Sequence, residues 1–323
     1  MRILVILDPL ESIKTYKDTS YTMMVAAQNA GHDVSVCEIG SLSFDSTGGA
    51  GASAGSDVTA SSRQISIREG QDNWYEAQPL AERSLTSFDA VIMRTDPPFN
   101  MEYVYATYML ELAESLGATV FNRPGAIRDH NEKFSIGQFP HLTAPTIVTR
   151  DPARLRAFVQ KHGRAIFKLL DGMGGMSIFQ ATREDPNLSV IIETLNQFGK
   201  QSVMAQKFLP QISAGDKRIL LIGGEVVPHA LARVPAKGEV RGNMAAGGTP
   251  IAQPLSDKDR AIAEELAPQL AERGLFLVGL DVIGDCVTEI NVTSPTGFRE
   301  IVDQTGFDVA AMFINKLEQA VGH

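Results

Sequence analysis

The chain has 323 residues, 44% hydrophobic and 21% charged, enough for two or three globular domains with a substantial core. Its net charge of −9 argues against a general nucleic-acid-binding protein, because phosphate contacts need a basic surface. Two cysteines exclude a disulfide framework, and six histidines show no metal-binding spacing. The first apolar run ends at Asp8 and no later run has membrane length, so we expect a cytoplasmic protein without a membrane partner.

The N-terminal third alternates strand and helix patterns. We expect strands at 2–7, 32–39, 89–94 and 118–122, and helices at 18–31 and 101–117. This order predicts an open parallel α/β domain over residues 1–124. Segment 48–62 is rich in glycine, alanine and serine and has few side chains that could pack, so we interpret it as a surface loop.

The pattern changes at about residue 125. Residues 125–202 predict a small central domain, and residues 203–323 a C-terminal domain built on an antiparallel sheet. The expected central elements are a helix at 151–163 and strands at 165–170 and 177–182. The C-terminal domain has strand-like stretches at 203–210, 217–233 and 275–292 and helices at 256–274 and 308–322. The fold class is therefore mixed α/β.

A glycine-rich loop follows the apolar strand at 165–170. Gly172, Gly174 and Gly175 fit either a tight hairpin turn or a loop whose N–H groups bind phosphate. Lys168 favours the phosphate loop, because a charge in an apolar strand is costly without a partner. The alternative is a lysine that reaches solvent from an edge strand.

Three oxygen-bearing side chains lie on a predicted β-ribbon near the C-terminus. If residues 284–286 form a three-residue hairpin loop, Asp281 lies opposite Glu289, and strand alternation places Asn291 on the same face. Carboxylate and amide oxygens suit magnesium, with phosphates and waters completing its shell. The alternative is a solvated strand face, although apolar neighbours leave little of the ribbon directed to solvent.

Three arginines accompany these ligands. Arg218 lies in a strand after Asp216, Arg233 ends another strand, and Arg241 lies in a glycine-rich loop. Each taken alone is more often a surface residue, but arginines beside a magnesium–phosphate site can clamp carboxylates or stabilise an oxyanion. Together the features predict phosphoryl transfer from ATP to an anionic substrate.

The motifs resemble those of the bacterial glutathione synthetases, which are ATP-grasp ligases. The resemblance covers nearly the whole chain, including RTDPPF at 94–99, and DGMGGMSIF with TEINVTSPTG is its most specific part. The other segments that carry it are NEKF (131–134), MAQKFLP (204–210), GDKRILLI (215–222), 231–248 and GLDVIGD (279–285). Leu169 and Thr95 depart from the family pattern, which has proline and lysine there.

The resemblance implies ATP-dependent joining of γ-glutamylcysteine to glycine through an acyl phosphate, in a homotetramer with small-molecule substrates. It places magnesium, with manganese as an alternative, on Asp281, Glu289 and Asn291. It assigns ATP to Lys133, Lys168, Gly174, Gly175, Gln206, Lys207, Leu209 and Asp216. It assigns the peptide and the chemistry to Arg218, Arg233 and Arg241, with Ser294 and Thr296 binding substrate. Loops 171–176 and 234–248 would be lids.

Two other functions are compatible with the residues. A related ligase acting on other substrates, such as D-alanine, would keep the ATP and metal residues and differ in the arginines and the SPTG segment. A nucleotide-sensing protein without turnover would be expected to lack the metal ligands, which this chain has.

Overall fold

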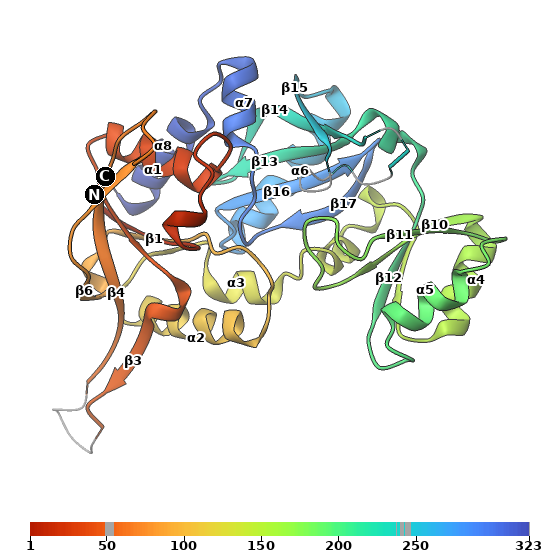
Figure 1. The fold of residues 1–323 in the computed structure, drawn as a ribbon, viewed down its shortest axis with the longest axis horizontal. Helices are drawn as coiled ribbons and strands as arrows, with labels where there is room; N and C mark the ends of the chain where they lie inside the picture. The colour runs from red at the N-terminus through yellow and green to blue at the C-terminus, as the bar shows by residue number, and fades with distance from the viewer. Residues whose placement is uncertain (49–54, 237, 240–241, 243–246, 323) are drawn as a thin grey trace.

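The structure is a computed structural model that describes residues 1–48, 55–236, 238–239, 242 and 247–322. Three β-sheets follow one another along the chain, each with its own helices (Figure 1). Within these ranges, no helix is both long and apolar enough to cross a membrane.

The N-terminal sheet has a parallel centre in the order β2-β1-β7-β8, as the alternating pattern predicts. These strands are β1 (Arg2–Ile6), β2 (Asp33–Cys37), β7 (Ala90–Met93) and β8 (Val120–Phe121); its helices are α1 (Thr19–Asn29), α2 (Met101–Ser115) and α3 (Pro124–Asp129). Asp18 caps α1 by accepting a hydrogen bond from the backbone N–H of Tyr21 at 2.8 Å. The expected helices and strands of this region are therefore confirmed.

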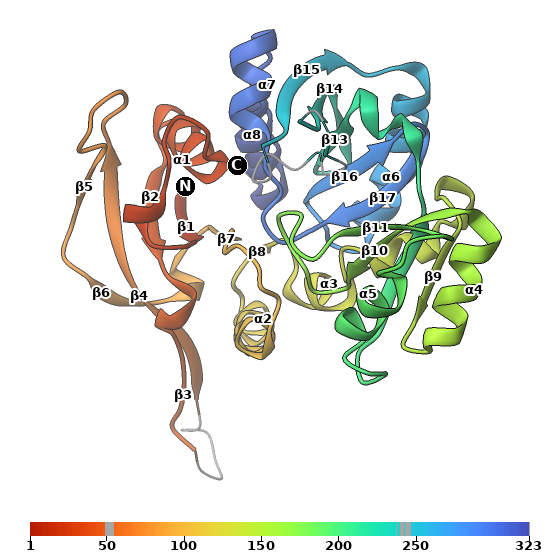
Figure 2. The same ribbon diagram turned by 45° about the vertical axis from the view of Figure 1, so that its right-hand side comes forward.

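An antiparallel extension of this sheet corrects one prediction. Strands β3 (Leu42–Ser46), β4 (Ser56–Ile67), β5 (Tyr75–Ala77) and β6 (Ala81–Ser84) continue the sheet beyond β2. The segment expected to be a loop to residue 62 is thus a strand from Ser56, because Val58, Ala60 and Ser62 alternate toward the interior and are buried. Residues 49–54 lie outside the described ranges. The β3–β4 ribbon extends away from the body of the molecule (Figures 1 and 2).

The middle sheet has the order β11-β10-β12-β9. Its strands are β9 (Thr146–Thr149), β10 (Arg164–Leu169), β11 (Phe179–Thr182) and β12 (Val203–Lys207), and its helices are α4 (Pro152–His162) and α5 (Leu188–Leu195). Phe158, Phe167 and Ile192 belong to the core between the sheet and these helices. Because β12 pairs with β10, we propose that the central unit extends beyond residue 202 to include this strand.

The third sheet is antiparallel, with the order β15-β14-β13-β16-β17. It comprises β13 (Asp216–Ile222), β14 (Glu225–Val234), β15 (Thr249–Pro254), β16 (Leu277–Ile283) and β17 (Cys286–Asn291), with α6 (Asp257–Glu272), α7 (Phe298–Thr305) and α8 (Val309–Val321). Side chains of β13 alternate between two cores: Ile219 packs in the core that contains α6, and Leu220 in the core that contains α8.

The first and third sheets share one continuous core. Met24 of α1 and Phe313 of α8 belong to the same cluster as Ile3 of β1 and Leu277 of β16. Figure 2 shows α7 and α8 between the N-terminal sheet and the third sheet. The large buried apolar surface fixes these two units against each other, and with them the two walls of the cavity described next.

Candidate active site

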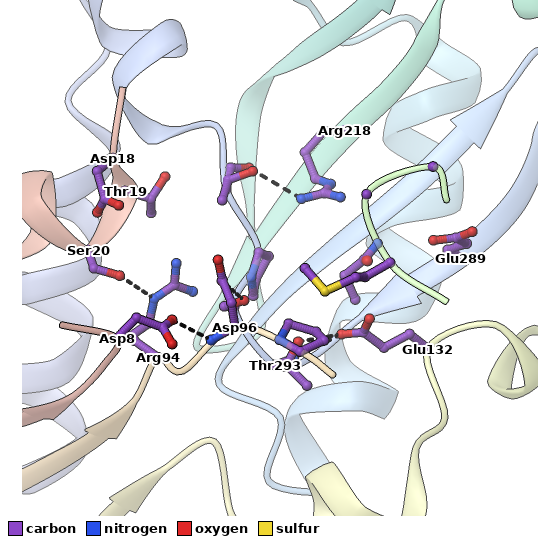
Figure 3. Close-up of a pocket in the computed structure, with 18 of the residues that line it drawn as sticks. Asp8, Asp18, Thr19, Ser20, Arg94, Asp96, Glu132, Arg218, Glu289 and Thr293 are labelled. Atoms are coloured by element: carbon purple, nitrogen blue, oxygen red, sulfur yellow. Dashed lines mark hydrogen bonds between the residues drawn. The ribbon is translucent and has the colours of Figure 1, made fainter. Parts of the chain in front are cut away.

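A cavity of about 430 Å³ lies where all three units meet (Figure 3). The N-terminal unit contributes Asp8 and Arg94, which follow β1 and β7, the central part of the chain contributes Lys133 and the glycine loop, and the third sheet contributes the acidic ribbon. Ligands of open α/β sheets bind beyond the carboxyl ends of the strands where the strand order reverses, and β1 and β7 flank that point here.

The β16–β17 ribbon brings the three expected oxygen ligands to this cavity. Asp281 pairs with Glu289 and Gly279 with Asn291, so all three side chains share one face and line the cavity. The expected pairing is confirmed, but the three-residue loop is wrong: Ile283 pairs directly with Cys286. A bulge between Asp281 and Val282 adds one residue on β17 and restores the same register.

Asp281 is held by two guanidinium groups. It is 2% exposed, and Arg218 donates to it through Nε at 2.6 Å and Nη2 at 3.2 Å. Arg233 lies 3.0 Å from its second oxygen. Burial by itself raises the pKa of Asp281, but Arg218 and Arg233 outweigh burial and hold the pKa below its ordinary value.

Glu289 is held by two ammonium groups. Lys168 of β10 donates to it at 3.2 Å and also to the carbonyl of Thr288, and Lys133 lies 3.9 Å away. Burial would raise the pKa of Glu289, but these two lysines lower it. Lys168 therefore points to the carboxylate of the neighbouring sheet, and the alternative of a lysine reaching solvent is wrong because Lys168 is buried.

The glycine loop occupies residues 170–178 between β10 and β11 and is too long for a tight hairpin turn. Gly174 and Gly175 have φ values of +58° and +81°, which favour glycine over other residues. Lys133 donates to the carbonyl of Gly172, so the loop is tied to the same lysine that faces Glu289. Gly172 to Met176 line the cavity.

A second, narrower pocket lies between the middle and third sheets. Its walls include Ile166, Ile178, Ile212 and, from the sequence-based predictions, Lys168, Gln206, Lys207, Leu209 and Asp216. Three residues, Ile178, Asp281 and Glu289, line both pockets. A largely apolar slot thus opens onto the charged cavity at the two carboxylates.

Asp216 lines this slot and forms an ion pair with Arg233, one of the two arginines that hold Asp281. Its Oδ2 accepts from Arg233 at 2.6 Å, whereas its Oδ1 is buried and has no hydrogen bond among the described residues. Burial raises the pKa of Asp216 to about 6. An unsatisfied oxygen beside an apolar pocket is a ready acceptor for a ligand hydroxyl.

The predicted residues fall into these two pockets with one exception. Ser294 and Thr296 line the main cavity, and Ser294 donates to Asp96. Arg241, together with part of the expected lid at 234–248, lies outside the described residues.

Sequence reasoning missed the N-terminal wall of the cavity. Asp8, Ser20, Arg94 and Asp96 gather there, and the backbone N–H of Asp96 donates to Asp8 at 2.9 Å. The available signal was an Asp-Pro pair, at 8–9 and 96–97, that begins within three residues of the end of each of two adjacent parallel strands. Such strands end at the same edge of a sheet, so their following residues converge.

The donors on the ribbon have the chemistry that a hard divalent cation requires. The Asn291 amide nitrogen donates to the carbonyl of Gly279 at 3.1 Å, and its oxygen has no hydrogen bond among the described residues. No group of three His, Cys, Asp or Glu side chains in that part of the chain is arranged as a metal site. Two carboxylates and one amide therefore fit a cation only where ligand oxygens complete its shell.

The sequence matches two family models in succession. Residues 1–128 match the N-terminal domain of prokaryotic glutathione synthetase, and residues 132–306 match its ATP-grasp domain. A glutathione synthetase of Ralstonia nicotianae is 54% identical over 100% of this chain and 97% of its own length. Those of Bordetella parapertussis, 52% identical over 100% of both chains, and Neisseria meningitidis, 52% over 99% of both, are similar.

Solved structures share the fold. The D-cycloserine synthetase DcsG superposes with a TM-score of 0.66 at 16% identity, over 99% of both chains. The ATP-grasp ligase PsnB, solved with a peptide variant, Mg and ADP, gives 0.62 at 18% identity, over 99% of this chain and 98% of PsnB. At these identities the likeness concerns the fold alone, which is that of the ATP-grasp ligases. With both family models matched in order and about half of all residues identical to full-length relatives, the chain belongs to the prokaryotic glutathione synthetase family.

Proposed function

We propose that the protein ligates γ-glutamylcysteine to glycine with ATP and Mg²⁺ and releases glutathione, ADP and phosphate. The observation that carries this proposal is the shared wall of the two pockets, where Asp281 and Glu289 face both the apolar slot and the charged cavity. A nucleotide base fits the chemistry of the slot, the phosphates fit the lysines at the junction, and the peptide fits the larger cavity.

The nucleotide end rests on Lys133, Lys168, Gly174 and Gly175, with Gln206, Lys207, Leu209 and Asp216 in the slot. The two lysines already lie on either side of the Glu289 carboxylate. Their ammonium groups can bind phosphate oxygens in the same way. A divalent cation on Asp281, Glu289 and Asn291 would neutralise phosphate charge and align the transferred group. The choice of Mg²⁺ over Mn²⁺ is part of the proposal.

The chemistry has two displacement steps. A cysteinyl carboxylate oxygen forms a bond to the γ-phosphorus while the bond to ADP breaks, which gives an acyl phosphate. The glycine amine then forms a bond to the acyl carbon, loses a proton, and phosphate leaves. Arg218, which already binds a carboxylate in the cavity, stabilises the tetrahedral oxyanion, with Arg233 and Arg241 as further cations. Ser294 and Thr296 bind the peptide.

The 170–178 loop is placed to exclude water from the cavity during the reaction. An acyl phosphate hydrolyses in water, so the cavity must be closed during the reaction. The 170–178 loop lines the cavity. It is held at its start by Lys133 and Asn131, which donate to the carbonyls of Gly172 and Leu170, and the glycines that follow suit it to close over bound phosphates.

An isotope experiment tests the proposal. With ¹⁸O in the cysteinyl carboxylate, the released phosphate should contain ¹⁸O, and product formation should require ATP, glycine and divalent cation together. Release of AMP, or unlabelled phosphate alongside glutathione, would contradict the acyl phosphate. D-Alanine in place of γ-glutamylcysteine is the matched control and should give no ligation.

Two further proposals come from the family resemblance. A homotetramer is checked by light scattering at working concentration, where a stable monomer would contradict it. A cytoplasmic location agrees with Cys37 and Cys286 being unpaired and is checked by fractionation.

A further inference from the structure

Arg94 differs from the other buried cations of the protein. Among the described residues, five lysine and arginine side chains are buried: Arg94, Lys133, Lys168, Arg218 and Arg233. The last four each have a carboxylate oxygen within 4.0 Å. Arg94 is 4% exposed and has no ion pair in this part of the chain. Of the five buried cations in the described ranges, it is the one without a carboxylate within ion-pair distance.

The hydrogen bonds of Arg94 also leave it incomplete. Its Nε donates to the hydroxyl of Ser20 at 3.0 Å, but its Nη1 is buried and has no partner among the described residues. Ser20 fixes the plane of the guanidinium group, which lines the main cavity (Figure 3). A planar group with a fixed orientation and an unused donor is suited to bind a carboxylate.

The surrounding acids do not supply the missing charge. Burial lowers the pKa of Arg94, and Asp96 and Asp18 only partly offset this from a distance. Asp18 already caps α1, and Asp96 accepts from Ser294. Because an isolated buried charge is costly, an anion in the cavity makes the arrangement favourable.

We propose that Arg94 binds the free α-carboxylate of the γ-glutamyl residue and thereby determines which peptides are accepted. The inference rests on the proposed function and deepens it. The group that Arg94 would recognise is the carboxylate of an α-amino acid. Glycine, the second substrate, also has one, so the two must be distinguished. Arg94 lies across the cavity from Glu289 (Figure 3). Under the proposed function, the reacting carboxylate of the peptide would meet the γ-phosphate at Glu289. The glutamyl side chain and a peptide bond separate the two carboxylates of the dipeptide, whereas the carboxylate of glycine stays next to its reacting amine.

Asp8 completes the site for a zwitterionic head. Its Oδ2 accepts only the backbone N–H of Asp96 among the described residues, and the carboxylate lines the cavity near Arg94. A protonated α-amino group beside the α-carboxylate would lie between Arg94 and Asp8. The pair therefore matches an α-amino-acid head rather than a simple dicarboxylate.

A substrate analogue tests the role of Arg94 directly. 4-Aminobutanoyl-cysteine is γ-glutamylcysteine with hydrogen in place of the α-carboxylate. The unmodified enzyme should prefer γ-glutamylcysteine by about 10²-fold in kcat/KM, the scale of one lost partner in a buried charge pair. Arg94→Gln should lower kcat/KM for γ-glutamylcysteine about 10²-fold, mainly through KM, and change that for the analogue less than about 3-fold. Arg128→Gln, a surface arginine paired with Glu111, is the control and should change neither.

Three results would overturn the proposal. Equal loss with both substrates would make Arg94 a structural residue, and a rise confined to the KM of glycine would assign it to the other carboxylate. An unmodified enzyme that turns over both substrates equally would refute it even if Arg94→Gln fails to fold. An unmodified enzyme that makes no glutathione counts against the proposed function instead, so the two failures are distinguishable.

Discussion

The acidic ribbon and the N-terminal wall each contain a buried charged side chain, Asp281 and Arg94, but they balance that charge differently. On the ribbon, Asp281 and Glu289 each lie between two cations of the protein, so the charges are compensated before any ligand binds. On the wall, the one hydrogen-bond partner of Arg94 within the described part of the chain is the hydroxyl of Ser20. Under the proposed function, a metal and phosphates would replace the cations of the ribbon at little electrostatic cost, whereas the wall would gain its balance from the substrate. Removal of a charge should therefore have opposite effects on stability in the two regions.

Glu289→Gln should give the largest effect. It removes the carboxylate shared by Lys133, Lys168 and the proposed cation, so we expect kcat to fall at least about 10³-fold. The two buried lysines also lose their partner, which should lower the free energy of unfolding by about 3 kcal/mol. Steady-state kinetics and urea unfolding measure both. Glu111→Gln, at a surface ion pair, is the control; a variant with normal rates at limiting magnesium would remove Glu289 from the metal site.

Arg218→Met should destabilise the ligand-free protein by about 2 kcal/mol, because Asp281 then keeps only Arg233. The pKa of Asp281 is depressed in the folded state, so its contribution is present above its unfolded pKa and is lost as pH falls through the folded value. The difference in the free energy of unfolding between the unmodified protein and the variant should accordingly be largest above about pH 4 and become smaller below it. Unfolding curves at pH 7 and pH 3 measure this; a deficit independent of pH would contradict the electrostatic cause.

The sequence predicts the ribbon better than the wall for a physical reason. Asp281, Glu289 and Asn291 lie on one hairpin, where alternation and antiparallel pairing determine their relative positions locally. The hairpin loop between β16 and β17 is one residue shorter than expected, and the bulge in β17 restores the expected pairing of Asp281 with Glu289. The partners of these carboxylates come from β10, β13 and β14, and no local pattern states which cation meets which acid.

The wall depends on contacts between distant parts of the chain. Asp8, Ser20 and Arg94 meet because β1 and β7 pair in parallel and α1 packs beside them. The missing counter-charge of Arg94 is a property of the whole cavity and cannot be obtained from any short segment. The first half of β4 was missed for another reason: its buried residues, Val58, Ala60 and Ser62, are small, so their alternation gives a weak hydrophobic signal.

Gly175→Ala tests whether the loop that joins the two regions needs its backbone conformation. Alanine at a φ of +81° costs about 1 kcal/mol or more, so the observed loop should be less populated and kcat/KM for ATP should fall about 10-fold. Gly172→Ala is the matched control in the same loop, because its φ is not positive and a Cβ would meet the Met176 carbonyl at 3.5 Å, an ordinary contact. Equal losses in the two variants would point to side-chain size instead of backbone conformation.

Arg94→Met should give the smallest change in the free energy of unfolding, and with the opposite sign. It removes a buried charge that has no ion pair among the described residues and replaces it with an apolar side chain. After the loss of the hydrogen bond to Ser20 is subtracted, the ligand-free protein should become more stable by about 1 kcal/mol. Thermal unfolding should show a rise of about 2 °C. Added γ-glutamylcysteine should raise the melting temperature of the unmodified protein and leave that of Arg94→Met nearly unchanged. A loss of stability comparable to that of Arg218→Met would mean that the wall is compensated within the protein, and the contrast between the two regions would not hold.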